Sequence, residues 1–388
     1  MNTILIVAGE NSGEKYGAGL VHQFKKIHPS IKFFGIGGEF MKREGVECIF
    51  SVQELSLVGG LEVLSHMPRI LKIFRKLKKL ACEKRPLAAV LIDSPDFNLR
   101  LAKILKKYSI PVLYYVSPTI WAWRKRRIRT IKKHIDKMML IFPFEEKIYE
   151  ENKIPATYVG HPLQDKVKPS LSKDEFFQKY GFDLQKKLIT ILPGSRKSEI
   201  KYHMPVLMKS ILLITEAFPA QFAFLLAENI DNHFFHGYIP PSFANTKILI
   251  HDHYDAMAFS DVILSACGTA NLESALLETP LISFYSISPI TYKLGVKFIK
   301  IKNYSIVNIL ANKRFVPELI QDRFTPQNIF HEVKKIIDSS EIRLKMKQEL
   351  KKIKTQLGNK SASQNAAQEL DRLIKPSLVA QKKVSNKV

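Results

Sequence analysis

Two acidic residues in the first half of the chain each follow a short apolar run. Asp93 follows the run 87–92, and Glu10 comes soon after the run 2–7. Such runs indicate buried strands of a parallel sheet, and ligands of open α/β sheets bind outside the carboxyl ends of the strands. We therefore predict that Asp93 is a general base and that Glu10 also lies where a ligand binds.

Polar residues also follow a strand-like run in the second half. The run 188–192 precedes a loop that contains Ser195 and Arg196 and then opens a helix. These two side chains can bind a diphosphate there, because an arginine fork forms charge-assisted hydrogen bonds with phosphate oxygens. Asn308 lies near the start of another predicted helix, where its amide could bind a ligand or only cap the helix.

The stretch 261–278 combines a strand-like run, a turn of small residues and a helix. Gly268 lets the backbone approach an anion closely, and Thr269 can cap the helix. Free N–H groups and the positive end of the helix dipole would face that anion. Glu273, about one turn further on, could bind sugar hydroxyls beside a phosphate. An ordinary connection between a strand and a helix explains the same stretch equally well.

The segment 61–80 is basic and amphipathic. Leu64, Met67, Leu71 and Phe74 recur at the spacing of one helix face, with Lys and Arg residues between them. One interpretation is a surface helix whose apolar face packs on the core. The other is a helix that lies on an anionic membrane, and it predicts that these four apolar side chains touch lipid.

A second basic cluster follows the strand-like run 111–116. It contains both tryptophans of the chain and then a series of Lys and Arg residues, namely Arg124, Lys125, Arg126, Arg127, Arg129, Lys132 and Lys133. The tryptophan rings could stack on a sugar or pack a domain wall. The basic side chains could bind nucleic acid, lipid headgroups or a phosphorylated substrate. Asp96, close to Asp93 in sequence, is expected to cap the helix that follows it.

Strand-like runs alternate with helical patterns in both halves of the chain. A chain of 388 residues is too long for one compact core, so we predict two α/β domains. We place the first domain at 1–165 and the second at 166–340. The helices of 341–375 are expected to pack back on the first domain or on a partner subunit, and 376–388 to form a basic, disordered tail.

The composition is that of a globular protein with a large surplus of basic residues. The formal net charge of +24 indicates an anionic partner, such as nucleic acid, an acidic membrane or a phosphorylated substrate. The three cysteines are scattered and lack metal-binding spacing, which favours a reducing compartment without a disulfide framework. We also expect no metal site and no cofactor. Because no apolar run reaches membrane-spanning length, we expect a cytoplasmic protein that is soluble or peripheral to a membrane.

Seven motifs, taken together and in this order, resemble lipid-A-disaccharide synthase, a family of inverting glycosyltransferases of bacterial outer-membrane lipid biosynthesis. They are AGENSGE (8–14), GIGG (35–38), LIDSPDFN (91–98), YVSPTIWAW (115–123), VGHP (159–162), LPGSRKSEI (192–200) and GTANLESAL (268–276). The resemblance covers about residues 4 to 370. It implies the GT-B architecture, in which two Rossmann-like domains with parallel sheets face each other across a cleft.

The resemblance also implies a reaction of lipopolysaccharide biosynthesis that needs no metal. The sugar of UDP-2,3-diacylglucosamine passes to 2,3-diacylglucosamine 1-phosphate (lipid X), giving the β-1,6-linked lipid A disaccharide 1-phosphate and UDP. Both substrates carry acyl chains at the cytoplasmic face of the inner membrane, which favours peripheral membrane contact through 61–80. The family also admits a homodimer formed through the C-terminal helices.

Matching the motifs residue by residue implies a set of roles. Asp93 matches the family's proposed base, and Glu10 matches its other acidic residue in the first domain. The charge that develops on departing UDP would be stabilised by Arg196 and by the helix N-terminus formed by Gly268, Thr269 and Ala270. Glu273 matches a ribose-binding carboxylate, and Asn308 matches an asparagine of the nucleotide site.

Two residues depart from the family pattern. Glu14 stands where an aspartate is expected, and Cys267 stands where a serine is more usual. Two other functions remain as alternatives. Another GT-B enzyme that uses a UDP-sugar, such as an epimerase, would share most of the motifs. A basic nucleic-acid-binding protein would explain the net charge, but no RRM, KH, zinc-finger or helix-turn-helix pattern supports specific nucleic-acid binding.

Overall fold

The structure is a computed structural model. It describes residues 2–56, 63–121, 124–227, 230–240, 243, 245–289, 292, 302–359 and 361–385, and of 56, 63–67 and 380–385 it describes the backbone alone. The chain forms two compact units, the first made of Met1–Pro162 with Asn359–Val388 and the second of Leu163–Gly358. The first unit therefore takes its last helix from the far end of the chain.

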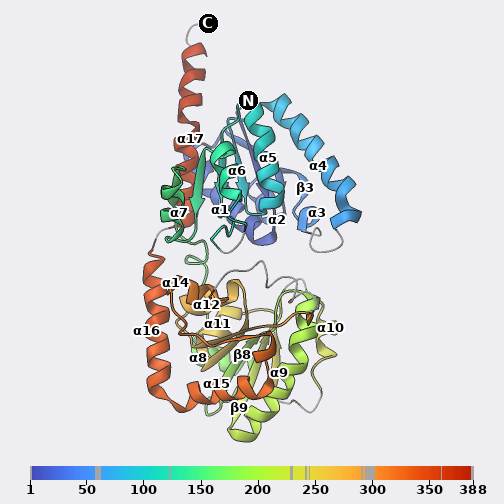
Figure 1. Cartoon of the computed structure of the whole chain (residues 1–388), viewed down its shortest axis with the longest axis vertical. Coiled ribbons are helices and arrows are strands. Elements are labelled where there is room, and N and C mark those ends of the chain that lie inside the picture. Colours follow the sequence, from blue (N-terminus) through green and yellow to red (C-terminus); the bar gives the residue numbers. More distant parts are fainter. Residues whose placement is uncertain are drawn as a thin grey trace. The chain divides into compact units, whose positions relative to one another are not determined.

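The first unit is built on a seven-stranded sheet in which every pair of neighbouring strands is parallel (Figure 1). Its order is β3-β2-β1-β4-β5-β6-β7. The strands are β1 Thr3–Ala8, β2 Lys32–Gly37, β3 Val46–Ser51, β4 Ala88–Ile92, β5 Val112–Tyr115, β6 Lys137–Leu140 and β7 Ala156–Tyr158. The order reverses between β1 and β4, so the crevice that binds ligands in such sheets opens beyond the carboxyl ends of these two strands.

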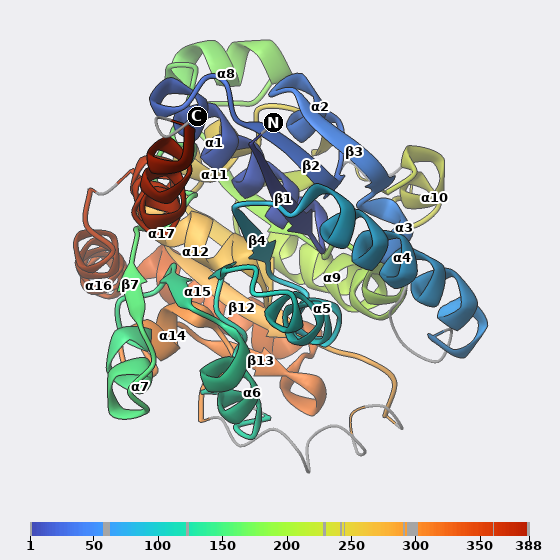
Figure 2. The same cartoon turned by 90° about the horizontal axis from the view of Figure 1, so that it is seen from above.

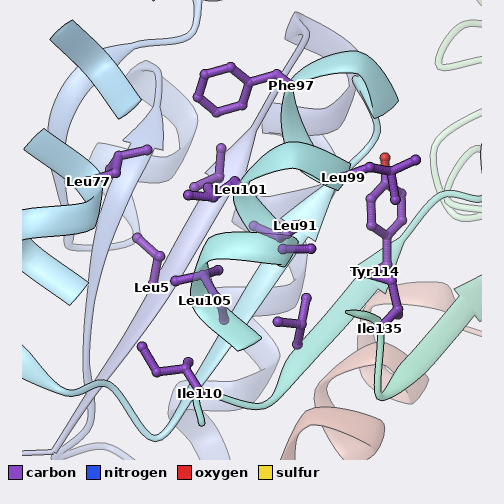
Figure 3. Close-up of a cluster of buried hydrophobic side chains, with 14 of the residues drawn as sticks. Leu5, Leu77, Leu91, Phe97, Leu99, Leu101, Leu105, Ile110, Tyr114 and Ile135 are labelled. Carbon is purple, nitrogen blue, oxygen red and sulfur yellow. The ribbon is translucent and has the colours of Figure 1, made fainter. Parts of the chain in front are cut away.

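Helices cover both faces of this sheet. They are α1 Asn11–Ile27, α2 Glu39–Arg43, α3 Gln53–Ser56, α4 Val63–Lys84, α5 Pro95–Lys107, α6 Arg127–His134, α7 Glu145–Glu151 and α17 Ala362–Ser385. On one face, Leu77 of α4 and Leu101 and Leu105 of α5 point toward Leu5 and Leu91 of the central strands (Figure 3). Alternate residues of the strands fill the core on the opposite face, as expected for a sheet covered on both sides.

The face of α4 that packs on the core is not the face formed by the predicted apolar residues. Ile73 and Leu77 are fully buried, and the ring of Phe74 packs on Phe97 with centroids 4.2 Å apart. The structure does not support the predicted lipid contact of Phe74, because this partly buried side chain packs against the core. Leu71 does face outward, with 45% of its surface exposed. The side chains of Leu64 and Met67 lie outside the described residues.

Helix α17 returns to the first unit and packs beside α1 (Figure 2). Its Leu370 and Ile374 join the core, and Asp371 accepts a hydrogen bond from His28 of α1 at 2.7 Å. The predicted disordered tail is wrong over 376–385, because α17 stays helical through Pro376 to Ser385. Among the described residues, no helix combines the length and the apolar character needed to cross a membrane.

The second unit is built on a six-stranded parallel sheet in the order β10-β9-β8-β11-β12-β13. Its strands are β8 Lys187–Leu192, β9 Ala220–Leu225, β10 Thr246–Leu249, β11 Val262–Ala266, β12 Leu281–Tyr285 and β13 Glu318–Ile320. The order reverses between β8 and β11. Two parallel-sheet α/β units, as predicted from the alternation of strands and helices, are thus confirmed.

Helices also surround the second sheet. They are α8 Lys173–Tyr180, α9 Lys197–Ala217, α10 Asn232–His236, α11 His253–Phe259, α12 Thr269–Leu276, α14 Ile306–Leu310, α15 Pro326–Asp338 and α16 Ser340–Gln356, with a 3-10 turn at Gln321–Arg323. Helix α16 packs on α12, α14 and α15 of this unit. The prediction that the helices of 341–375 pack back on the first domain is therefore wrong for α16, and of these two described helices it is α17 that returns.

Candidate active site

The switch point of the first sheet brings Glu10 and Asp93 together. Ala8 of β1 pairs with Ile92 of β4 in the last register position of these strands, and the two acidic residues follow directly beyond it. Glu10 is the N-cap of α1, and Asp93 begins the turn into α5. The two predicted catalytic residues therefore lie at the same edge of the sheet, where the fold places its ligand crevice.

Asp93 has a strained backbone that its neighbours hold in place. Its φ is +53°, and φ of Ser94 is +42°, a region that side-chain-bearing residues rarely adopt. The carbonyl oxygen of Asp93 accepts hydrogen bonds from Asn98 Nδ2 at 2.8 Å and from the Tyr114 hydroxyl at 2.6 Å. These two bonds fix the turn, so the Asp93 carboxyl is positioned before any substrate binds.

Gly9 lets the two loops of the switch point approach each other. Its amide donates a hydrogen bond to Ile92 O at 3.2 Å. A Cβ atom at Gly9 would lie 1.9 Å from Cβ of Ser94, well inside any tolerable contact. Glycine is therefore required here by close packing of backbone, and any larger residue would push Glu10 away from Asp93.

The surroundings of Asp93 suit a general base. Burial raises the pKa of Asp93 from 3.8 to about 6, and the nearby charge of Glu10 adds to this rise. A carboxylate with a pKa near 6 is still ionised at neutral pH, and it is a stronger base than an ordinary aspartate.

Asp96 has a role that the sequence analysis missed. It was expected to cap α5, but the N-cap of that helix is Ser94. The Asp96 carboxylate instead accepts hydrogen bonds from Arg124 Nη1, at 2.8 and 3.1 Å to its two oxygens, and from Arg127. This ion-pair cluster holds the basic segment that follows the tryptophans beside the first turn of α5.

A buried carboxyl, Glu145 at the start of α7, also escaped the sequence analysis. Its side chain is 1% exposed, and its Oε2 atom has no hydrogen-bond partner among the described residues. Burial raises the pKa of Glu145 to about 8, and the neighbouring Ser117 and Trp121 side chains offset this only in part. Glu145 is therefore protonated at neutral pH. The pattern around it, Phe-Glu-Glu-Lys, resembles an ordinary helix start and carries no sign of burial.

The switch point of the second sheet brings the predicted anion-binding residues together. Leu192 of β8 pairs with Ser265 of β11, and the two small-residue loops follow these strands. Helix α12 begins after Gly268, which is its N-cap, so Thr269 and Ala270 are its first residues and Thr269 does not cap it. Their backbone N–H groups have no acceptor inside the helix by its geometry. Glu273 is partly buried one turn further on.

Gly268 itself is not required by the fold. Its φ of 169° is ordinary extended backbone, and a Cβ atom there would meet no other atom within 4 Å. The open space in front of this residue is consistent with close approach of a ligand, which is the reason given for a glycine at this position.

The buried carboxylate of Glu199 anchors the loop after β8 through hydrogen bonds. Glu199 is 7% exposed and accepts hydrogen bonds from Ser195 N at 2.9 Å and Arg196 Nη1 at 3.0 Å. Tyr285 also donates to it at 3.2 Å. Glu199 was missed as a site residue, although its place three residues after the N-cap is the spacing of a capping box. The Arg196 side chain remains 71% exposed.

The side chain of Asn308 forms its hydrogen bonds with nearby residues of the same unit. It is fully buried in α14, and its Nδ2 donates to Val316 O and to Glu318 Oε1, each at 2.9 Å. Its Oδ1 accepts from the amides of Phe315 and Val316 at 3.1 and 3.0 Å. Since both donors and both acceptor positions are used, the structure gives no support for the predicted nucleotide contact. Asn308 does not cap α14 either, because Ser305 is the N-cap.

The two departures from the family pattern both have a local explanation. Glu14 is buried, and its Oε1 accepts a hydrogen bond from Met41 N at 3.1 Å, so it ties α1 to α2. A Cβ atom at Gly38, the N-cap of α2, would lie 2.9 Å from the Glu14 carboxyl, which shows how closely the two helices approach there. The Cys267 thiol lies 3.1 Å from the Ser283 hydroxyl, and burial raises its pKa to about 12.

Comparison with known proteins assigns the family. The family model described as lipid-A-disaccharide synthetase matches residues 4–372. The chain belongs to the lipid-A-disaccharide synthetase family. It is 37% identical to the lipid-A-disaccharide synthase of Geobacter metallireducens over 365 residues, which cover 94% of this chain and 95% of that protein. The predicted resemblance is thereby confirmed.

Solved structures show that the family fold is shared with other sugar-nucleotide enzymes. The chain is similar to the UDP-GlcNAc 2-epimerase of Neisseria meningitidis, with a TM-score of 0.60 at 14% identity, covering 96% of this chain and 99% of that one. It is also similar to CalG4, the calicheamicin glycosyltransferase, with a TM-score of 0.63 at 12% identity over 97% of this chain and 99% of that one. At these identities the likeness concerns the GT-B fold alone.

Proposed function

We propose that this protein transfers the sugar of UDP-2,3-diacylglucosamine to 2,3-diacylglucosamine 1-phosphate, with release of UDP. Asp93 takes the proton of the acceptor hydroxyl as that oxygen attacks the anomeric carbon. The bond from that carbon to the diphosphate breaks, and UDP leaves with the bonding electrons. The observation that supports this proposal most directly is the turn at Asp93, whose backbone carbonyl is held by Asn98 and Tyr114 and whose buried carboxyl has a pKa of about 6, which suits a base.

The second unit supplies groups for the leaving diphosphate. Negative charge grows on UDP as the glycosidic bond breaks, and hydrogen-bond donors aimed at that charge lower the barrier. We assign this role to Arg196, Ser195 and the α12 N-terminus at Gly268, Thr269 and Ala270. The Arg196 side chain is mostly exposed, so its guanidinium can reach a ligand while Glu199 anchors one of its nitrogens. Glu273 is assigned to the ribose hydroxyls.

The direct test is UDP release from UDP-2,3-diacylglucosamine in detergent, measured with and without the monosaccharide 1-phosphate acceptor. Release that depends on the acceptor is expected. Release that ignores the acceptor would indicate a hydrolase or another enzyme of the same fold. Release from water-soluble UDP-GlcNAc in the absence of a lipid acceptor would favour an epimerase-like activity instead.

We also propose that the outer face of α4 contacts the cytoplasmic membrane surface. Leu71 is exposed there among Lys72, Arg75 and Lys76, which are exposed as well. Acidic headgroups attract such a face, and an exposed leucine adds apolar contact. Leu71→Ser should weaken binding to vesicles that contain phosphatidylglycerol without changing thermal stability, whereas the exposed Leu344→Ser on α16 should change neither. Unaltered vesicle binding by Leu71→Ser would show that α4 does not contact the membrane.

A further inference from the structure

We propose that Arg124 and Arg127 bind the phosphate monoester of the sugar acceptor. The proposal rests on the function proposed above, and it assigns a binding site for the end of the acceptor that does not react. The two guanidinium groups converge on Asp96, which lies in the first turn of α5, three residues after the base Asp93.

Asp96 marks the position at which these arginines hold an anion. Both of its oxygens accept hydrogen bonds from Arg124 Nη1, and Arg127 donates to one of them. The donors of a guanidinium group match the oxygen geometry of both carboxylates and phosphates, so arginines that hold a carboxylate are also suited to a phosphate. The side chains of Asp96 and Arg124 are 68% and 49% exposed, so this side of the cluster is open to a ligand that arrives from solvent.

Arg127 connects this anion site to the base. Its side chain is only 13% exposed, and its charge is close enough to oppose the rise that burial causes in the pKa of Tyr114. The Tyr114 hydroxyl in turn donates to the carbonyl oxygen of Asp93 at 2.6 Å. Arg127 therefore lies close to Tyr114, the residue that positions the base.

The local charge favours a dianion. The stretch 124–135 contains seven Lys and Arg residues and neither Asp nor Glu. Asp96 can offset only one of these positive charges. A phosphate monoester carries a charge of about −1.5 to −2 at neutral pH, whereas a phosphodiester headgroup carries one negative charge. The acceptor phosphate is thus the better match for paired arginines. A sugar without this phosphate would lack the contact and would bind less well.

The test measures binding without turnover. Glucosamine 1-phosphate is titrated into the full-length protein by calorimetry at physiological ionic strength, with glucosamine as the uncharged comparison. Arg124→Gln and Arg127→Gln are each expected to weaken the binding of glucosamine 1-phosphate by about tenfold or more, because each removes a charge-assisted pair. Arg129→Gln, an exposed arginine of the same helix, is the matched control and should bind as the wild type does.

The outcomes separate the proposal from its alternatives. Equal binding by all variants, equal weakening by Arg129→Gln, or no binding of glucosamine 1-phosphate to the wild type would overturn it. Phosphatidylglycerol vesicles test whether the arginines bind a lipid headgroup instead. The proposal predicts that both variants still bind these vesicles. Loss of vesicle binding with retained glucosamine 1-phosphate binding would make the arginines a membrane contact instead. Arg124 is half-exposed, so Arg124→Gln keeps the test valid if Arg127→Gln fails to fold. Failure of the proposed function would appear separately, as absent UDP release.

Discussion

The two sheet switch points differ in how much of each site is held in place by the protein. Around Asp93, the strained turn is fixed by Asn98 and Tyr114, and the loop from β1 packs against it through Gly9. Around Gly268, a Cβ atom added to this glycine would meet no atom within 4 Å, and the Arg196 side chain is 71% exposed. A base must be aligned before it can act, whereas groups that bind a leaving diphosphate can close on it when it arrives. The comparison suggests that precision resides in the first unit and adaptability in the second.

The largest effect should come from removing the base. Asp93→Asn keeps the shape of the side chain but cannot accept the proton, so kcat should fall by about 10²- to 10⁴-fold. The same variant should be more stable at pH 7, by up to about 3 kcal/mol, because it removes a carboxylate whose pKa is raised from 3.8 to about 6. UDP release tests the predicted loss of activity, and thermal unfolding tests the predicted gain in stability. Asp174→Asn, which changes an exposed residue of α8, serves as control. Loss of activity together with loss of stability would instead indicate a structural role.

Arg196→Gln should have the next largest effect, and it tests the diphosphate-binding groups of the second unit. It removes one donor to the departing diphosphate, which typically costs about 10² to 10³ in kcat. Because Arg196 is exposed, the thermal stability should stay close to that of the wild type. Lys201→Gln, an exposed residue further along α9, should leave both quantities unchanged. Normal turnover in Arg196→Gln would remove this arginine from the proposed mechanism.

Tyr114→Phe tests whether the strained turn matters for catalysis. It removes the 2.6 Å hydrogen bond to the Asp93 carbonyl but keeps the buried ring. We expect kcat to fall by about tenfold and KM to change little, since a bond of this kind contributes roughly 0.5–1.5 kcal/mol. Tyr108→Phe, an exposed tyrosine just after α5, serves as control. If KM rises and kcat is unchanged, the hydroxyl binds substrate and does not position the base.

Glu145→Gln should have the smallest effect on activity and a distinct effect on stability. The folded protein keeps the Glu145 proton up to about pH 8, while the unfolded chain releases it near 4.5. The wild type therefore loses free energy of unfolding as the pH rises between these values, relative to the neutral glutamine variant. Denaturant unfolding of both proteins at pH 5, 7 and 8.5 should show a growing advantage for Glu145→Gln. A constant difference would mean that the carboxyl is not buried in its protonated form.

Sequence patterns predicted the architecture and both switch-point clusters because these depend on local signals. Apolar runs mark the parallel strands, and the residues just after them reach the carboxyl edge of the sheet whatever the details of packing. Asp93, Glu10, Ser195 and Arg196 could therefore be placed without coordinates.

The failures share a different cause, which is contact between residues distant in sequence. Phe74 was assigned to lipid because helical spacing defines a face without saying which face meets the core. Asn308 and Asp96 were given ligand-binding or capping roles, yet the side-chain partners that the structure shows lie 7 or more residues away along the chain.

The most direct test of the central claim is the pH dependence of kcat/KM for UDP release between pH 4.5 and 8. The account predicts that kcat/KM rises about tenfold per pH unit up to about 6 and then levels off, because Asp93 must lose its proton to act. Glu10→Gln should move this rise to lower pH, since the charge of Glu10 raises the pKa of Asp93. A profile that is flat across this range, or a rise that persists in the residual activity of Asp93→Asn, would show that another group is the base.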